Sequence, residues 1–154
     1  MKHLAELNIA RFRHPAEDPR NADFMNNLDR INGIAERSPG FVWRLKDDSG
    51  NATAVRAFDD PLVIVNLTVW ETAEALERFV WQTVHKQFYG RRPEWFEPMK
   101  GPHFVMWWVP VGHRPTLDEA KAKLERLAAH GDSDDAFGWE ALPHVKLWRS
   151  VRCA

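Results

Sequence analysis

Apolar and polar residues alternate along two stretches of the chain in the manner of β-strands. In residues 3–13 one face is aliphatic, whereas the other carries Glu6 and Asn8. Residues 62–70 repeat the pattern, with valines and a leucine on one face and Asn66 on the other. The sequence therefore predicts two strands, each with an apolar face and a second face of mixed character.

Three further segments show weaker or different strand patterns. Residues 41–45 are apolar and aromatic, and a turn-like composition follows them. A short segment around residues 54–58 can pair back onto this strand. Residues 103–110 form a nearly continuous apolar run, which predicts a strand that is buried on both sides.

Signals for helix ends divide the remaining sequence into three helices. The first begins at Asp18-Pro19, an N-cap followed by a proline, and ends at the Ser-Pro-Gly turn of residues 38–40. The second follows the strand of residues 62–70 and runs without interruption to Arg92. The third begins at a capping box in residues 116–119 and ends at Gly131.

The resulting order, β-α-β-β-α-β followed by a helix, indicates an α+β fold of the ferredoxin-like type, in which two helices cover one face of an antiparallel sheet. We expect one domain over residues 1–154, with a ferredoxin-like core in 1–115 and a C-terminal helix and extension in 116–154. The mixed sheet face with Glu6 and Asn8 is too apolar to remain in water. We therefore expect a second copy of the protein to close over it as a symmetric homodimer.

The second helix carries an aromatic stripe opposite its ordinary core stripe. This aromatic stripe consists of Trp81, His85, Phe88 and Tyr89, with Arg92 one turn further along. An apolar area of this size must be covered, because an exposed one would be an interaction site. The cover is a ligand, a second subunit or the C-terminal third of the chain, through residues such as Phe137, Trp139 and Leu142.

Composition is typical of a folded protein, with 44% hydrophobic and 28% charged residues. Eight tryptophans and a single tyrosine indicate a bulky core, a stacking cavity for a flat ligand or a subunit interface. The formal net charge of −1, from well-mixed charges, argues against nucleic-acid binding. We expect a cytoplasmic protein without membrane association, because no long apolar run or signal peptide is present and Cys153 is alone.

Motifs for several kinds of chemistry are missing from the sequence. The seven histidines do not have the spacing of a metal site, so we expect no bound metal. Glycine patterns of nucleotide-binding loops and a nucleophile elbow are also missing, which argues against nucleotide-dependent chemistry and triad hydrolysis.

Five short segments, at residues 4–8, 37–45, 69–76, 91–96 and 107–116, read LAELN, RSPGFVWRL, VWETAEAL, RRPEWF and WWVPVGHRPT. Together with the order of elements, they resemble the dimeric α/β-barrel superfamily of antibiotic-biosynthesis monooxygenases. More narrowly, they resemble an uncharacterised bacterial branch of that superfamily. The resemblance implies a barrel formed across a homodimer, with a cavity between the sheet and the helices.

Members of this superfamily include cofactor-independent monooxygenases of aromatic polyketides, haem-degrading enzymes, chlorite dismutase-like haem proteins and small isomerases. The haem-degrading branch uses an Asn on the first strand and a Trp and a His on the second helix. Asn8, Trp81 and His85 lie near the matching positions, although Trp81 and His85 are closer together than in that branch. The resemblance thus implies either no cofactor or haem.

His85, Asn66 and Asn8 are the candidate catalytic residues. The imidazole of His85 can act as a general base or an axial haem ligand, or it can simply donate a hydrogen bond to a backbone carbonyl. The two amides can hold a carbonyl or peroxide oxygen of a substrate, or they can pair structurally with each other.

Aromatic residues and one arginine are the candidate contacts for a small hydrophobic or aromatic ligand. The tryptophans can stack on a flat ligand or fill the core. Arg92 can bind a carboxylate, cap its helix or pair with Glu94. The expected substrate-binding residues are Trp70, Trp81, Trp43, Phe12, Tyr89 and Arg92.

Three functions are consistent with the sequence. The favoured one is a cofactor-independent monooxygenase-like enzyme that acts on a flat aromatic substrate. The second is a haem-binding or haem-degrading protein with His85 as the axial ligand. The third is a non-catalytic binding or interaction protein, in which residues 132–154 cover the aromatic stripe and no cavity exists.

Overall fold

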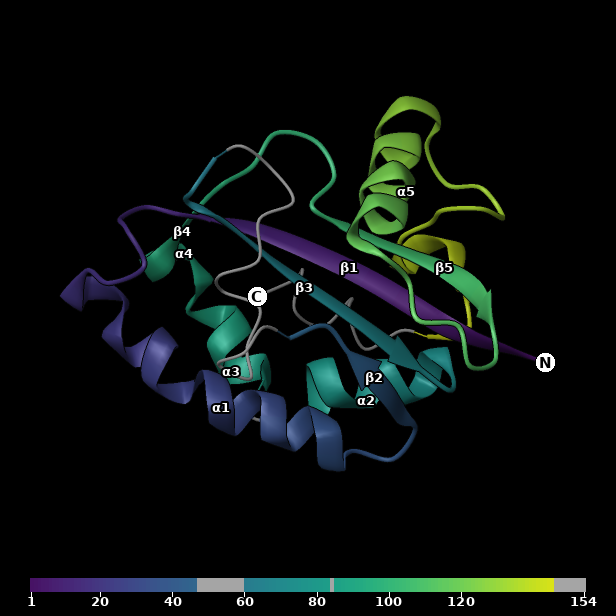
Figure 1. Cartoon of the computed structure of the whole chain (residues 1–154), viewed down its shortest axis with the longest axis horizontal. Helices are drawn as coiled ribbons and strands as arrows, with labels where there is room; N and C mark the ends of the chain where they lie inside the picture. Colours follow the sequence, from purple (N-terminus) through teal and green to yellow (C-terminus); the bar gives the residue numbers. More distant parts are fainter. Residues whose placement is uncertain (47–59, 84, 146–154) are drawn as a thin grey trace.

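The structure, a computed structural model, describes residues 1–46, 60–83 and 85–145. The short pairing segment expected around residues 54–58 lies outside the described residues. Strands and helices follow one another in the predicted order (Figure 1). They are β1 (Lys2–Phe12), a 3-10 turn (Pro19–Asn21), α1 (Ala22–Arg37), β2 (Phe41–Arg44), β3 (Val63–Trp70), α2 (Ala73–Gln82), α3 (His85–Gly90), α4 (Arg92–Trp95), β4 (Phe96–Glu97), β5 (Phe104–Pro110), α5 (Leu117–His130) and a second 3-10 turn (Trp139–Ala141).

The strands form one antiparallel sheet with β1 at its centre. β3 pairs with one side of β1 and with β2 beyond it, while β5 and the short β4 share the other side of β1. This arrangement confirms the predicted ferredoxin-like α+β fold. The register places Glu6 opposite Thr68 and Asn8 opposite Asn66, so these four side chains share one face of the sheet.

Helices α1, α2 and α3 cover the sheet face that carries Glu6 and Asn8 (Figure 1). The expectation that a second copy of the protein closes over this face was wrong. Leu4 and Trp70, from the same face, pack with Leu76 of α2 in one core cluster. The apolar surface that suggested a partner is thus buried by the chain's own helices, and the polar groups on this face border a cavity.

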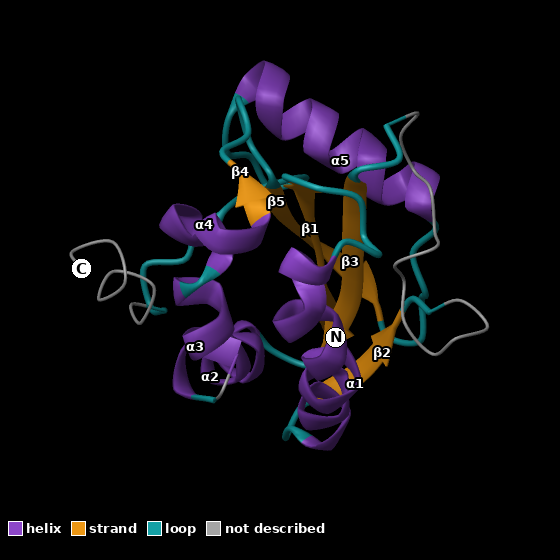
Figure 2. Cartoon of the chain, turned by 90° about the vertical axis from the view of Figure 1, so that its left-hand side faces the viewer, coloured by secondary structure: helices purple, strands orange, loops and turns teal. Residues whose placement is uncertain are grey.

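Helix α5 packs on the opposite face of the sheet, which is the aliphatic one (Figures 1 and 2). Ala5 and Leu7 of β1 share a core cluster there with Ala120 and Leu124 of α5. Trp43 packs against the same cluster. The C-terminal helix therefore forms a second layer of the molecule, and the sheet lies between two helical layers.

The predicted long second helix is interrupted at Thr83. Helix α2 ends at Gln82, and Thr83 adopts an extended backbone with φ −118° and ψ −177° before α3 begins at His85. The Thr83 hydroxyl donates a 2.6 Å hydrogen bond to the Phe79 carbonyl and accepts a 3.2 Å bond from the backbone N–H of His85. Such side-chain bonds to the backbone compete with helix continuation, and the chain changes direction here.

Strand β5 is less buried than predicted. It pairs with β1 on one side and forms a single bridge, between Met106 and Phe137, on the other. The indole of Trp107 is buried on the α5 side, but Trp108 is 37% exposed. A strand of an antiparallel sheet can leave part of one face open to water, so the apolar run alone overestimated its burial.

The segment that follows α5 covers part of the aromatic stripe. The ring of Trp139 lies 6.3 Å from that of Trp81 and stacks on Phe104 at 5.5 Å, centroid to centroid. The C-terminal third of the chain, one of the three expected covers of the stripe, therefore covers it at Trp81. None of the helices in the described ranges is both long and apolar enough to cross a membrane.

Candidate functional site

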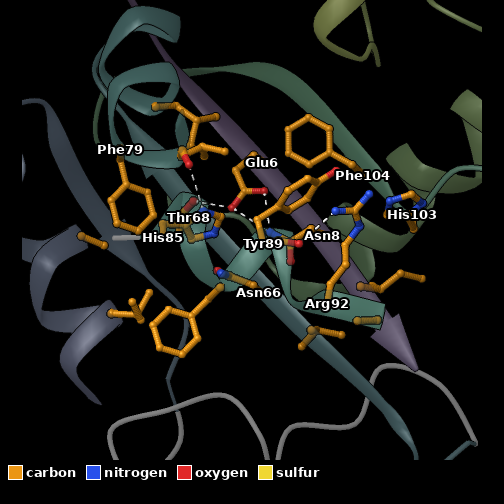
Figure 3. Close-up of a pocket in the computed structure, with 18 of the residues that line it drawn as sticks. Glu6, Asn8, Asn66, Thr68, Phe79, His85, Tyr89, Arg92, His103 and Phe104 are labelled. Atoms are coloured by element: carbon orange, nitrogen blue, oxygen red, sulfur yellow. Dashed lines mark hydrogen bonds between the residues drawn. The ribbon is translucent and has the colours of Figure 1, made fainter. Parts of the chain in front are cut away.

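A cavity of about 530 Å³ lies between the Glu6 face of the sheet and helices α1, α2 and α3. Strands β1 and β3 contribute one wall, and the helices contribute most of the other, together with residues from the segment after α5. Its lining is mainly aliphatic and aromatic, with polar side chains both on the sheet and on the helices (Figure 3). This combination is typical of sites for small organic ligands.

Glu6 is the buried carboxyl group of this cavity, with only 3% of its surface exposed. The Thr68 hydroxyl donates a 2.7 Å hydrogen bond to Glu6 Oε1, and the side-chain amide of Asn8 donates a 3.1 Å bond to Oε2 (Figure 3). Burial raises the pKa of Glu6 from 4.5 to about 7, although the two hydrogen bonds act in the opposite direction. The carboxyl group can therefore exchange a proton near neutral pH.

A second hydrogen bond fixes the orientation of the Thr68 hydroxyl. The indole Nε1–H of Trp70 donates to Thr68 Oγ1 at 2.9 Å, so the hydroxyl hydrogen is left to point at Glu6. Trp70 itself is fully buried and packs against Phe79 and Phe41, with ring centroids 5.3 and 5.4 Å away. These contacts make the Trp70–Thr68–Glu6 chain a rigid part of the sheet.

His85, at the start of α3, lies on the cavity wall formed by the helices. Its Nδ1 is 3.2 Å from the carbonyl oxygen of Val80, which can only accept, so Nδ1 carries the hydrogen of the neutral ring. The lone pair of Nε2 is then available. Burial lowers the pKa of His85, which keeps the ring neutral near pH 7, and Phe79 and Tyr89 pack beside it.

Asn8 and Asn66 both line the cavity, but their amides do not bond to each other. Asn8 instead donates to Glu6. Asn66 forms no side-chain hydrogen bond with any residue in the described part of the chain. Its amide is therefore available to a ligand, whereas the amide of Asn8 positions the carboxyl group.

Trp81, Tyr89 and Arg92 also line the cavity. The ring of Tyr89 packs edge-on against Trp81 at 5.1 Å, and the guanidinium of Arg92 lies over the Tyr89 ring at 4.0 Å. Arg92 is exposed, so this group stands at the border between the cavity and solvent. The break at Thr83 brings His85 and Tyr89 to the cavity wall from a helix of their own.

The structure places Phe12, Trp43 and Trp70 outside the cavity lining. Phe12 is fully buried in a cluster with Phe24 and Phe96, and Trp43 is on the α5 side of the sheet. Trp70 acts through Thr68 rather than at the cavity surface. These three side chains are therefore not placed to contact a ligand in this cavity directly.

Glu6 was not among the candidate site residues, although its place in the first strand, with Leu4-Ala5 before it and Leu7 after it, was visible in the sequence. A carboxylate at a strand position flanked by buried residues is a signal for a perturbed acid, because carboxylates are rarely fully buried without a reason.

In the described residues, no cluster of three or more His, Cys, Asp or Glu side chains is arranged to hold a metal ion.

The sequence profile of a family described as a domain of unknown function, DUF3291, matches residues 3–153. The chain belongs to this family. A comparison with curated protein sequences gave no match. The family's description assigns no reaction, so the chemistry of this DUF3291 protein must be inferred from its own site.

Several solved structures resemble this chain at low sequence identity. A protein of unknown function from Nitrosomonas europaea is 11% identical, with a TM-score of 0.50, and the match covers 75% of this chain and 97% of that one. The cofactor-independent oxygenase SnoaB from Streptomyces nogalater is 18% identical, with a TM-score of 0.45 and coverage of 76% and 98%. A Streptomyces coelicolor monooxygenase, in complex with nanaomycin D, is 15% identical, with a TM-score of 0.45 and coverage of 75% and 93%. The first likeness shows the fold alone, and the other two are too distant to indicate an activity.

Proposed function

We propose that this DUF3291 protein is an enzyme that removes a proton from a flat hydrophobic or aromatic molecule bound in the cavity, with Glu6 as the general base. The observation that carries the proposal is the buried carboxyl group of Glu6, which borders the cavity and has a pKa of about 7. A base with a pKa near the ambient pH is substantially ionised and still basic enough to accept a proton.

The volume and lining of the cavity support a flat apolar substrate. A volume of about 530 Å³ is within the range of sites for small organic molecules. Rings from several elements line it, Phe79, Tyr89 and Phe104 among them. Flat ligands gain from stacking on such rings, and the apolar surroundings keep the carboxylate of Glu6 poorly solvated and reactive.

Asn66 and His85 complement the base. When a proton leaves a carbon next to a carbonyl group, negative charge develops on the carbonyl oxygen, and an amide N–H placed beforehand stabilises that charge. Asn66 has such an amide, without another partner in the described residues. The neutral ring of His85 has a lone pair on Nε2 that can accept a hydrogen bond from a substrate hydroxyl.

The reaction that the sequence resemblance favours is cofactor-independent monooxygenation. Removal of a proton from a CH₂ group between aromatic rings, as in an anthrone, gives an electron-rich anion that reduces O₂ directly. The CH₂ group becomes a carbonyl, one oxygen atom enters the product, the other leaves as water, and the substrate supplies all of the electrons. Glu6 accepts the first proton in this scheme and can return it to the departing oxygen.

Haem binding through His85 is a second candidate, and one observation favours it. Ligating histidines commonly donate their other ring N–H to a backbone carbonyl, as His85 does to Val80. If haem were bound, Nε2 of His85 would hold its iron, and the group would supply iron redox chemistry. Titration of the purified protein with hemin tests this candidate, because a bound haem shifts the Soret band and His85→Ala should abolish that shift.

Oxygen uptake with an anthrone-type substrate tests the main proposal. Glu6→Gln is expected to lower the rate by about 100-fold or more, because general-base catalysis contributes roughly that factor. Asn66→Ala should lower it by a smaller factor, and Glu17→Gln, which changes an exposed carboxylate outside the cavity lining, should leave it unchanged. Rates that are the same for the wild type and Glu6→Gln would contradict the proposal.

The homodimer expected from the resemblance is part of this proposal, although the face first assigned to it is covered by α1, α2 and α3. The available surface is the opposite face, where Trp43, Leu45 and Met99 are only partly buried around the cluster under α5. Sedimentation velocity at micromolar concentration measures the oligomeric state. Detection of a monomer alone would contradict the proposed homodimer, but it would leave the proposal for the cavity standing.

A further inference from the structure

Arg92 at the border of the cavity differs from Arg91, its neighbour in the sequence. Arg91 binds Glu94 at 2.8 Å and Asp23 at 2.9 Å, so its charge is satisfied by two carboxylates. Arg92 forms no ion pair with any residue in the described ranges. It contacts Tyr89 instead, through a 2.9 Å hydrogen bond to the backbone carbonyl and through the ring beneath its guanidinium.

These two contacts fix the guanidinium without neutralising it. A hydrogen bond to a carbonyl and stacking on an aromatic ring both orient an arginine and leave its other N–H groups free to donate. Figure 3 shows the Arg92 side chain on the cavity lining, near the ring of Tyr89 and near His103. A positive group is therefore held in place at one end of the cavity.

The other charged groups on the lining do not compete for this position. Arg44 is paired with Glu36 at 2.9 Å. Asp132 accepts a 3.0 Å hydrogen bond from the backbone of Gly138, and it belongs, like Glu140, to the segment after α5. Asp132 and Glu140 are exposed carboxylates, so neither offers a positive charge to an anionic group of a bound molecule.

His103 supports the same assignment. It lines the cavity, and burial, with a smaller contribution from the charge of Arg92, lowers its pKa. The influence of Arg92 shows that the two side chains are near each other. A neutral imidazole beside the guanidinium can donate a hydrogen bond to an anion without adding a second positive charge that must be desolvated.

We propose that the ligand of this cavity is an aromatic acid anion, whose carboxylate or equivalent acidic oxygen binds Arg92 while its ring system extends inwards towards Glu6 and Asn66. This inference rests on the proposed function, because it assigns the substrate class of the same site. An anionic anchor at the border leaves the uncharged part of the ligand in the apolar interior. The reacting carbon is then held away from the anchor and close to the base.

Binding of two matched probes tests the inference without requiring turnover. The probes are anthraquinone-2-carboxylate and anthraquinone-2-carboxamide, which share their ring system and differ in charge, and quenching of tryptophan fluorescence reports their binding. The wild type should bind the carboxylate about 10-fold more tightly, as expected for one charge-assisted contact at a partly solvated site. About 0.5 M NaCl should reduce this preference, because it screens the charge of Arg92.

Two substitutions of Arg92 and one control substitution test whether the preference for the carboxylate depends on this residue. Arg92→Gln should reduce the preference for the carboxylate to about 2-fold or less, whereas Arg92→Lys should retain part of it. Arg78→Gln, which removes an exposed arginine of α2 that is not on the lining, should leave the preference intact. Thermal melting of each variant confirms that the fold is retained.

The outcomes distinguish this inference from the proposed function. Equal affinity of the wild type for the two probes, or an undiminished preference in Arg92→Gln, would overturn the anionic anchor and leave the aromatic site standing. Binding of neither probe to the wild type would count against both. Loss of activity in Glu6→Gln with unchanged probe preference would support both.

Discussion

The Thr68 hydroxyl donates a 2.7 Å hydrogen bond to the buried carboxyl group of Glu6, across the pairing of β1 with β3. The two residues are 62 positions apart in the sequence, and the sheet register alone makes them neighbours. The hydroxyl is itself held by the indole of Trp70. A titrating acid is thus buried in the central strand pairing of the sheet, which makes its properties measurable by stability as well as by activity.

The first prediction concerns Glu6→Gln and the pH dependence of stability. In the folded state the pKa of Glu6 is raised to about 7 from 4.5, so the folded protein holds this proton more tightly than the unfolded chain does. The contribution of this group to the stability of the fold is therefore largest below about pH 4.5, and it decreases as the pH rises to about 7. The fall amounts to about 3 kcal/mol, because each pKa unit corresponds to about 1.4 kcal/mol.

Urea unfolding at about pH 5 and about pH 8.5 measures this effect. The wild type should lose about 2 to 3 kcal/mol more between these pH values than Glu6→Gln, which cannot ionise. Glu17→Gln, at an exposed position, should follow the wild type. If Glu6→Gln lost as much stability as the wild type, the carboxyl group would not be titrating in this range.

A second prediction concerns Thr68→Val, which keeps the shape of the side chain and removes its hydroxyl. The buried Nε1–H of Trp70 then has no acceptor, and such an unpaired group costs about 1 to 3 kcal/mol. Thr68→Ser keeps the hydroxyl and should lose considerably less stability. Equal losses in the two variants, measured by urea unfolding, would show that the hydroxyl contributes little.

The third prediction follows from the proposed role of Glu6 as a base. The rate constant kcat/KM should rise with pH and level off above about 7, because only the ionised carboxylate accepts a proton. The hydrogen bond from Thr68 lowers the pKa of Glu6, so its loss in Thr68→Val should move the inflection to higher pH. A profile that is flat between about pH 5 and 9, or one that Thr68→Val shifts to lower pH, would contradict this role.

The fourth prediction concerns Gly40, which joins α1 to β2 beside the first turn of α2. Its φ is +86°, and a Cβ atom placed there would lie 2.5 Å from the Cβ of Ala75. Gly40→Ala should therefore combine backbone strain with a steric clash. Gly112→Ala is the matched control, because Gly112 has φ +89° but nothing within 4 Å of the added atom.

Thermal or urea unfolding of both variants separates the two contributions. Gly112→Ala should cost about 1 kcal/mol, which is the strain of a left-handed conformation. Gly40→Ala should cost about 1 to 3 kcal/mol more, the range for overpacking. Similar losses in the two variants would mean that α2 moves freely away from the turn.

The order of elements was predictable because alternation and end signals are local. Thr116 caps α5 as expected, with a hydrogen bond from the backbone N–H of Glu119. Asp18 accepts a bond from the backbone N–H of Arg20, but it caps the 3-10 turn at Pro19–Asn21, and α1 itself begins only at Ala22. The break at Thr83 was not predictable in the same way. Helical periodicity continues through it, and only the position of the hydroxyl between Phe79 and His85 ends the helix.

It was harder to predict which elements cover each face of the sheet than to predict the strands themselves. Both faces of β1 carry apolar residues, so alternation alone could not decide which face the first two helices cover. Glu6 and Asn8 were placed correctly on one face, but that face lies under the chain's own helices and borders a cavity. The raised pKa of Glu6 depends on this burial, which no short-range pattern in the sequence contains.

Phe137 pairs with Met106 on the free side of β5, through backbone bonds of 2.8 and 2.9 Å. An uncovered edge strand offers its N–H and C=O groups to strands of other molecules, which is the first step towards cross-β fibres. At Met106 these groups are already occupied by a segment that follows in the same chain. Growth of the sheet from one molecule into the next is therefore blocked at the middle of this edge without any charged residue being needed there.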